Sequence, residues 1–393
     1  MKKVEYDVIV VGAGISGLLI ASELSNNHSV LVIEKESNIP TNKYWLTNKK
    51  SVKNNPELSN CIDSSYDHMN FIAYDGAKFK CLGDYILWDT IKLLGKLKTD
   101  ISNNGSKVLT NYQFYSYRYN QSSISITANA EEFSSKLLID CMGFASPIIY
   151  AKNLIDIYGY YYLNGAVLKL KKEIDPIGLS NISLSKSPKY LEVFPKKNNT
   201  AYVVLIQPEK SISKNTTIKQ EFNFLVSKSS LSNYFVPEED KTKSLFGLIP
   251  VGKLKTQSLD RIYLFGEAGQ MNPGATATCL TQLFYSYKEI ALELSKRIRA
   301  NKLSIDNLTI ENPSFTKLNK RFHLNLFKNI LDWNSDDFKS LILQMNNMDN
   351  KLVNDVIFGE IDFQIVVKWK NIKNLLSNKN YFVLKPLLKS LLT

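Results

Sequence analysis

A glycine-rich turn between an apolar run and a helix-like stretch, in YDVIVVGAGISG, constrains the fold of this chain more than any other segment. Val8 to Val11 form a β-branched run that is typical of a strand buried on both faces. Gly12, Gly14 and Gly17 follow at once in G-x-G-x-x-G spacing. This order predicts a strand, a sharp turn and a helix from Ile15 to Ser25.

The spacing of the glycines is that of a pyrophosphate site. The first glycine allows the turn, the second lets the backbone approach the phosphates, and the third lets the helix pack closely on the sheet. The helix N-terminus adds unpaired N–H groups and a positive dipole end. A second buried strand, Ser29 to Ile33, ends in Glu34, whose carboxylate can accept both hydroxyls of an adenosine ribose. The unit therefore predicts a dinucleotide site, and the absence of an arginine at position 34 argues against NADP.

Two later stretches also run from a strand into a glycine turn. Leu137 to Asp140 is an apolar run with Gly143 three residues after it, and ligands of open α/β sheets bind at such carboxyl ends. The strand Arg261 to Phe265 runs into GEAGQMNPG, after which a helix should start within Ala275 to Thr278. The N–H groups of that helix would favour negative charge on the N1–C2=O edge of a reduced flavin, and Glu267 could hydrogen-bond a ribityl chain. The third stretch thus narrows the expected cofactor to FAD.

In order and spacing, the three stretches resemble the FAD-dependent group that includes p-hydroxybenzoate hydroxylase-type monooxygenases, geranylgeranyl reductases, lycopene cyclases and flavin-dependent halogenases. FGEAGQMNP, with Glu267, looks most like lycopene cyclases, LLIDCMGF resembles the D-C-S-G-F of halogenases, and YLEVFP stands where geranylgeranyl reductases have Y-x-W-x-F-P. The resemblance extends from Tyr6 to Ala300. The residues expected to bind FAD are Gly12, Ala13, Gly14, Ser16, Gly17, Glu34, Lys35, Gly143, Gly266, Glu267, Ala268, Pro273 and Gly274.

Departures from the group bear on mechanism. YLEVFP replaces both tryptophans of the halogenase W-x-W-x-I-P, and Asp84 or Tyr85 stands where many members have an arginine. PGATAT replaces the usual P-x-T-G. GAKFKCLG resembles the lysine segment of halogenases, which implies Lys80 as a catalytic candidate, with a chance match as the alternative. Glu192, in a strand that should face the pocket, is the acid/base candidate, and a solvent-facing strand carboxylate is the alternative.

Composition argues against a nucleic-acid-binding, a metal-binding or a membrane-spanning protein. The 393 residues suggest two or three domains, and 44% hydrophobic with 22% charged residues is typical of a globular protein. The net charge of +12 comes from lysines interspersed with Asn and Ser and no nucleic-acid motif accompanies them, so a solvated surface is favoured over nucleic-acid binding. Four scattered cysteines and three histidines form no zinc-like set, so no metal and reduced thiols are expected. With no apolar run of about 18 residues and no room for a signal peptide, a cytoplasmic protein is expected.

The remaining pattern predicts an α/β fold with a doubly wound, Rossmann-like FAD domain, an antiparallel substrate domain and a helical C-terminal region. A hairpin is expected over Asn70 to Leu82 with its turn at Asp75-Gly76, then a helix from Tyr85 to Leu97. Tail helices are expected over 315–331, 336–346, 350–357 and 366–376. The expected domains are 1–45, 84–149 and 251–300 for FAD, 46–83 and 150–250 for substrate, and 301–393 for the helical region.

The leading functional hypothesis is an FAD-dependent oxidoreductase acting on an apolar small molecule, by monooxygenase- or halogenase-like oxygenation or by reduction of an isoprenoid-type double bond. The alternatives are a non-redox cyclase of lycopene cyclase type and a flavin-binding protein without catalysis. No second G-x-G-x-x-G is present, so a separate flavin reductase or transiently bound NAD(P)H should supply electrons. The basic tail, with YFVLKPLLKSLLT, favours a docking helix over peripheral membrane contact.

Overall fold

The glycine-rich turn connects β1 (Tyr6–Val11) to α1 (Ile15–Leu24), and β2 (Val30–Ile33) follows, as predicted. The structure is a computed structural model that describes residues 5–181, 189–212, 217–236, 244–312, 314–362 and 389–390. β1 pairs in parallel with β2. Gly12 has φ +101°, a conformation that a side chain would disfavour, and this permits the sharp turn.

The first sheet surrounds β1. Its other strands are β6 (Lys107–Leu109), β7 (Phe114–Tyr119), β8 (Ile124–Ala128), β9 (Glu131–Asp140), β15 (Ser258–Leu259) and β16 (Ile262–Leu264). The order β15-β16-β9-β1-β2-β6 is parallel from β16 to β6, and β8 and β7 extend from β9 as antiparallel strands. One face carries α1, α3 (Thr90–Asn103) and α6 (Cys279–Arg299), and the other lies against β7, β8 and α4 (Pro147–Ala151). Both faces of β1 are therefore covered, which explains its unbroken apolar run.

The second sheet is mainly antiparallel. Its strands are β3 (Leu46–Asn48), β4 (Ile62–Ile72), β5 (Lys78–Trp88), β10 (Ile155–Lys169), β11 (Ile177–Asn181), β12 (Tyr190–Pro195), β13 (Thr200–Glu209) and β14 (Ser244–Leu254). Their order is β14-β10-β13-β12-β11-β4-β5-β3, with β11 and β4 parallel. α5 (Ile218–Lys228) covers one face. α2 (Lys49–Asn54) lies against β5 and α6, at the border with the first sheet.

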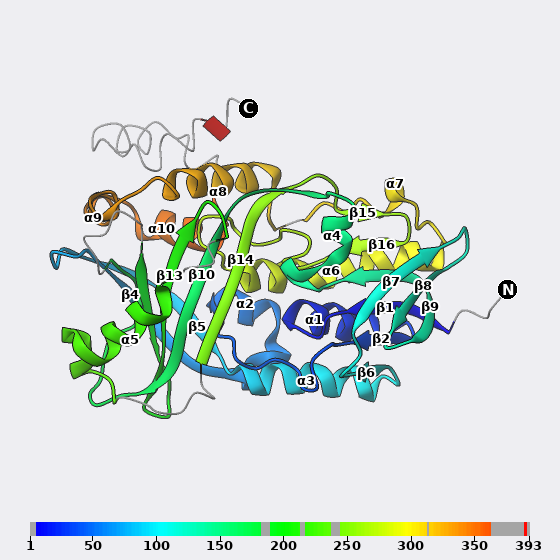
Figure 1. Cartoon of the computed structure of the whole chain (residues 1–393), viewed down its shortest axis with the longest axis horizontal. Coiled ribbons are helices and arrows are strands. Elements are labelled where there is room, and N and C mark those ends of the chain that lie inside the picture. Colours follow the sequence, from blue (N-terminus) through cyan, green and yellow to red (C-terminus); the bar gives the residue numbers. More distant parts are fainter. Residues whose placement is uncertain are drawn as a thin grey trace.

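Helices from the C-terminal region cover the other face of the second sheet (Figure 1). α8 (Lys317–Ile330) packs on β14, α9 (Ser335–Met345) on β4 and β5, and α10 (Asn350–Phe358) on β5. Side-chain caps fix where they begin: Thr316 caps α8, Asn334 forms a capping box with Asp337 at α9, and Asp349 caps α10. The short α7 (Ile305–Leu308) links α6 to this layer.

Several local expectations need correction. Residues 85–88 belong to β5, and the helix begins only at Thr90, because Asp89 caps it by accepting the N–H of Lys92. The third motif's helix begins at Cys279, after a turn, rather than within 275–278. β5 and β14 both cross the expected domain boundaries, at 83/84 and 250/251. The expected tail helix over 366–376 lies outside the described residues.

The expected fold class is confirmed: a doubly wound parallel sheet adjoins a mainly antiparallel sheet and a layer of C-terminal helices. The Asp75-Gly76 hairpin is also present, with longer strands than expected and Gly76 at φ +89°. Within the described ranges, no helix is both long enough and apolar enough to span a membrane.

Candidate active site

Three segments far apart in the chain meet at the carboxyl ends of β1, β9 and β16. A methyl group placed on Gly12 would lie 2.6 Å from the carbonyl oxygen of Cys141, so the first turn touches the segment after β9. One placed on Gly143 would lie 3.3 Å from Oε2 of Glu267, which joins the second segment to the third. The strands are parallel neighbours, so their carboxyl ends share one edge of the sheet.

The first turn keeps an open surface beside this meeting point. A methyl group on Gly14 would come within 4 Å of no other described atom, which leaves room for a ligand against the backbone. The Glu34 carboxylate accepts the N–H groups of Ala13 at 2.8 Å and Glu36 at 3.1 Å. The acid is thereby held next to the turn, where a ribose would lie if the phosphates bound over Gly14.

The third segment is a loop closed at two points. The N–H of Met271 donates to the carbonyl of Gly266 at 3.0 Å, and the N–H of Gly266 approaches Sδ of Met271 at 3.3 Å. The carbonyl of Pro273 then accepts the N–H of Ala277 at 2.7 Å, with Ala277 at φ +54°. These turns deliver the chain to the start of α6 at Cys279.

Glu267 projects from this loop into the interior. Burial raises the pKa of Glu267 to about 7, and the charge of Lys43 partly opposes the shift. Its Oε1 has no hydrogen-bond partner among the described residues. A buried polar atom without a partner is costly, so a ligand that donates a hydrogen bond there would be favoured.

A single cavity of about 840 Å³ extends from the glycine turns to the face of the second sheet beneath α8, α9 and α10. Expected site residues on its wall are Gly12, Gly14, Ser16, Glu34, Lys35, Gly143, Glu192 and Glu267. The far end is formed by large apolar and aromatic side chains, which include Met69, Phe71, Tyr190, Phe194, Trp333 and Phe338. A polar, glycine-rich end and an apolar end therefore share one space.

Of the described residues at the apolar end of the cavity, one carries a carboxyl group, Glu192 on β12. It accepts a short hydrogen bond from the hydroxyl of Tyr44. Burial raises the pKa of Glu192 to about 7, and the bond from Tyr44 partly opposes this. Its neighbour Tyr161, whose pKa is raised by burial and then by the Glu192 charge, donates to the carbonyl of Ala275 at 2.7 Å. Tyr161 thereby fastens the segment that follows the Glu267 loop to β10.

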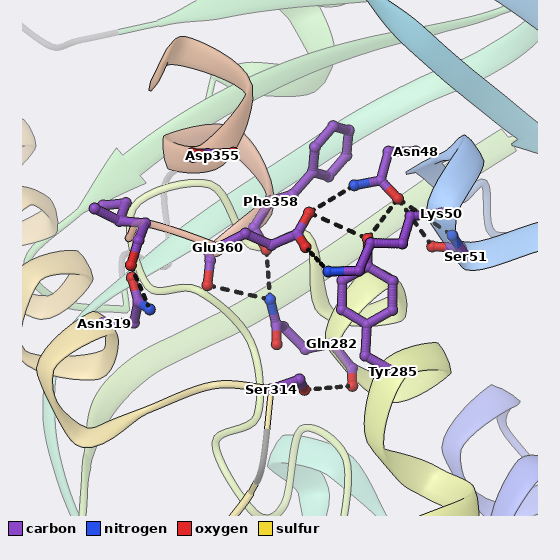
Figure 2. A network of polar contacts seen from close by, with 12 residues as sticks. Asn48, Lys50, Ser51, Gln282, Tyr285, Ser314, Asn319, Asp355, Phe358 and Glu360 are labelled. Atoms are coloured by element: carbon purple, nitrogen blue, oxygen red, sulfur yellow. Dashed lines mark hydrogen bonds and ion pairs between the residues drawn. The ribbon is translucent and has the colours of Figure 1, made fainter. Parts of the chain in front are cut away.

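A polar network centred on Glu360, called here the Glu360 clasp, holds the end of α10 (Figure 2). The Glu360 carboxylate accepts from Asn48 at 2.7 Å, Lys50 at 2.6 Å and Tyr285 at 3.1 Å. Gln282 of α6 donates to the carbonyls of Phe358 at 2.5 Å and Gly359 at 3.3 Å. The end of α10, which lines the cavity through Val353, Val356 and Ile357, is therefore fastened to α2 and α6.

Replacing Gly359 with alanine is expected to loosen this clasp. Gly359 has φ +71°, and a methyl group there would lie 2.8 Å from Cγ of Pro273. Gly105 has φ +74° but open space around the same position, so Gly105→Ala carries only the backbone cost. Thermal unfolding should show G359A less stable than G105A by about 1–3 kcal/mol, the usual cost of overpacking. Equal losses of stability in G359A and G105A would mean that Pro273 moves away from the added methyl group at no cost.

Not every expected residue reaches the cavity. Lys80 is not one of the described residues that line the cavity. Its side chain is exposed on β5, between the buried side chains of Phe79 and Cys81. Alternation along the strand directs it away from the site. Residues of the motifs that shape the turns without lining the cavity are Ala13, Gly17, Gly266, Ala268, Pro273 and Gly274.

Tyr44 and Asn272 are among the cavity residues that were not anticipated from the sequence as site residues. Tyr44 stands beside Trp45 in an otherwise polar segment, and that isolated hydrophobic position is the one sequence signal it gives. Asn272 gave no signal beyond preceding Pro273. Among the described residues, no group of His, Cys, Asp and Glu side chains is arranged to hold a metal ion.

Comparisons with known proteins agree with this geometry. The family model of lycopene cyclase proteins matches residues 7–175. No curated protein sequence matches the chain. The match covers nearly all of β1, the glycine turn and the following strands through the end of β10.

Solved structures share the fold at low identity. A geranylgeranyl bacteriochlorophyll reductase-like protein from Thermoplasma acidophilum has a TM-score of 0.71 at 18% identity, over 95% of this chain and 99% of that chain. OxyS anhydrotetracycline hydroxylase from Streptomyces rimosus has 0.65 at 14%, over 90% and 76%. Halogenase PltM in complex with phloroglucinol and FAD has 0.62 at 11%, over 98% and 95%. The resemblance to this group of flavoenzymes is thereby confirmed at the level of the fold.

Proposed function

We propose that this protein is an FAD-dependent oxidoreductase that reduces a carbon–carbon double bond of an apolar, isoprenoid-like molecule. The observation that supports this reaction best is the shared cavity of about 840 Å³, in which one protonatable carboxyl, Glu192, stands in the apolar end. The likeness to a reductase-like fold at a TM-score of 0.71 is consistent with it.

The residues present fit FAD. The open backbone at Gly14 suits a pyrophosphate, Glu34 suits the ribose hydroxyls, and the unpaired Oε1 of Glu267 suits a ribityl hydroxyl. When bound and reduced, FAD would supply the electron pair, as a hydride, to one carbon of the double bond.

Glu192 would supply the proton to the other carbon. With a pKa of about 7, a substantial share of its carboxyl is protonated at neutral pH and most of it below that pH. The apolar wall keeps bulk water from competing. When the proton leaves, the Tyr44 hydroxyl donates to the carboxylate that remains. Solvent then returns the proton, which balances the addition of one hydride and one proton.

The direct experiment uses the full chain loaded with FAD and reduced anaerobically with a stoichiometric amount of dithionite. Geranylgeraniol is the probe, and mass spectrometry of the extract reads the product. A gain of two hydrogens, one reduced bond for each flavin oxidised, supports the proposal. Flavin oxidation only on admission of oxygen, with oxygen in the product, would contradict it and favour an oxygenase.

A second candidate is a non-redox cyclase, because the lycopene cyclase family model matches residues 7–175 and Glu192 could equally protonate a double bond to start ring closure. A cyclase forms an isomer of its substrate without net flavin oxidation. Lycopene, offered in the same assay, separates the two reactions by product mass. FAD binding with no product from either probe would favour a flavin protein without catalysis.

The electron donor and any membrane contact are further proposals. A separate flavin reductase or transient NAD(P)H would provide the electrons, and NAD(P)H oxidation by the FAD-loaded chain alone tests between them. Residues 363–388, which hold most of the basic tail, lie outside the described residues, so its contact with a membrane remains a prediction.

Tyr44→Phe is expected to shift the pH profile to higher pH. The Tyr44 hydroxyl lowers the pKa of Glu192 against the effect of burial, so its removal should raise that pKa further. The alkaline limb of the turnover rate should then move to higher pH, with the plateau at low pH largely kept. Tyr66→Phe is the matched control, because Tyr66 lies in the same aromatic group but donates to the carbonyl of Pro195. If the alkaline limb of the Y44F pH profile stayed at the wild-type pH, the assignment of Glu192 as the proton donor would be contradicted.

A further inference from the structure

Asn272 is a buried amide that has no use in the protein itself. Its exposed fraction is 6%, and neither Oδ1 nor Nδ2 has a hydrogen-bond partner among the described residues. The side chain lines the cavity. Leaving both halves of a buried amide unpaired is costly, so the position would be better filled by an apolar residue unless a ligand completes it.

The backbone on both sides of Asn272 is fixed. Met271 before it is bonded to Gly266, and Pro273 after it accepts the N–H of Ala277. Proline also restricts the conformation of the residue before it, and Pro273 in turn packs against Gly359 at the end of α10. The backbone that carries the amide at the cavity wall is therefore fixed by closed turns and by packing against the end of α10.

We propose that Asn272 binds the imide edge of the flavin ring, pairing one donor and one acceptor with the N3–H and an adjacent carbonyl. The inference rests on the proposed binding of FAD. A primary amide presents an acceptor and a donor side by side, and an imide presents the complementary pair. An isoprenoid-like molecule has no such pair, so the apolar substrate does not satisfy Asn272. Glu267, five residues earlier, is left for the ribityl chain.

The test pairs a protein variant with a modified flavin. FAD and N3-methyl-FAD, in which the imide N–H is blocked, are titrated into apoprotein, and flavin fluorescence gives each dissociation constant. The wild type should bind N3-methyl-FAD about tenfold more weakly than FAD, the effect of one lost hydrogen bond in a buried site. Asn272→Leu removes both hydrogen bonds, so it should bind FAD at least about tenfold more weakly than the wild type and should bind the two flavins equally.

Asn42→Leu is the matched control, because Asn42 also lines the cavity but is exposed. It should keep the wild-type preference for FAD. Wild-type protein that binds both flavins equally would overturn the role of Asn272 alone. Wild-type protein that binds neither would overturn the proposed FAD dependence, and this role with it.

Discussion

Replacing Glu192 with glutamine is expected to lower the turnover rate of the reduced, FAD-loaded protein by roughly 10²–10⁴-fold, the usual contribution of a positioned general acid. Glutamine keeps the shape of the side chain and can accept the bond from Tyr44, but its amide has no acidic proton to transfer. Single-turnover kinetics with geranylgeraniol measure the loss. FAD affinity and thermal stability should stay near those of the wild type.

The same residue sets the sign of the pH dependence. Burial raises the pKa of Glu192 to about 7, so the protonated acid predominates below this pH and is lost as the pH rises through it. Wild-type turnover should therefore fall on the alkaline side, and E192Q should lack this limb. Lys80→Ala is the control, since its exposed side chain lies away from the cavity, and its rate should be unchanged. Halide incorporation that disappears in K80A would instead restore the halogenase interpretation.

Replacing Gly17 with alanine is expected to abolish both FAD binding and stable folding. A methyl group on Gly17 would lie 1.9 Å from the carbonyl oxygen of Gly12, so α1 would have to move off the turn and away from the sheet. The cost should be roughly 3 kcal/mol or more, because backbone must yield rather than a flexible side chain. Flavin content after purification and thermal unfolding report the two effects.

Gly95→Ala provides the matched control within another helix of the same domain. Gly95 is exposed in α3, and a methyl group there would meet no described atom within 4 Å. Alanine should stabilise that helix by about 1 kcal/mol. If G17A were as stable as G95A and retained its flavin, the turn would not be the rigid element that the fold indicates.

Local sequence patterns predicted much of the fold. The turn at Gly12 and its two flanking elements were predictable because strand burial, glycine spacing and helix start all act within a few residues. The spacing of apolar residues was a less reliable guide at Tyr85, because residues 85–88 are compatible with either a helix or a strand. Pairing of β5 with β3 and β4 decided for a strand, and Asp89 set the start of the helix behind it.

Long-range packing decided which of the two catalytic candidates lines the cavity. Lys80 and Glu192 were both candidates by sequence, yet β5 turns Lys80 to the exterior while β12 turns Glu192 toward the cavity. Tyr44 reaches Glu192 across 148 positions of sequence, a contact that no motif spacing encodes. Asn272 is recognisable only because its surroundings leave its amide unpaired.

The sequence by itself determined the dinucleotide unit, the order of its three loops and the class of fold, because each rests on conformational preferences between near neighbours. Only the tertiary structure decided which carboxyl is enclosed with the apolar end of the cavity and which lysine is left outside. Enclosure depends on how two sheets and a helical layer pack. The pKa of an enclosed acid depends in turn on the water that this packing removes.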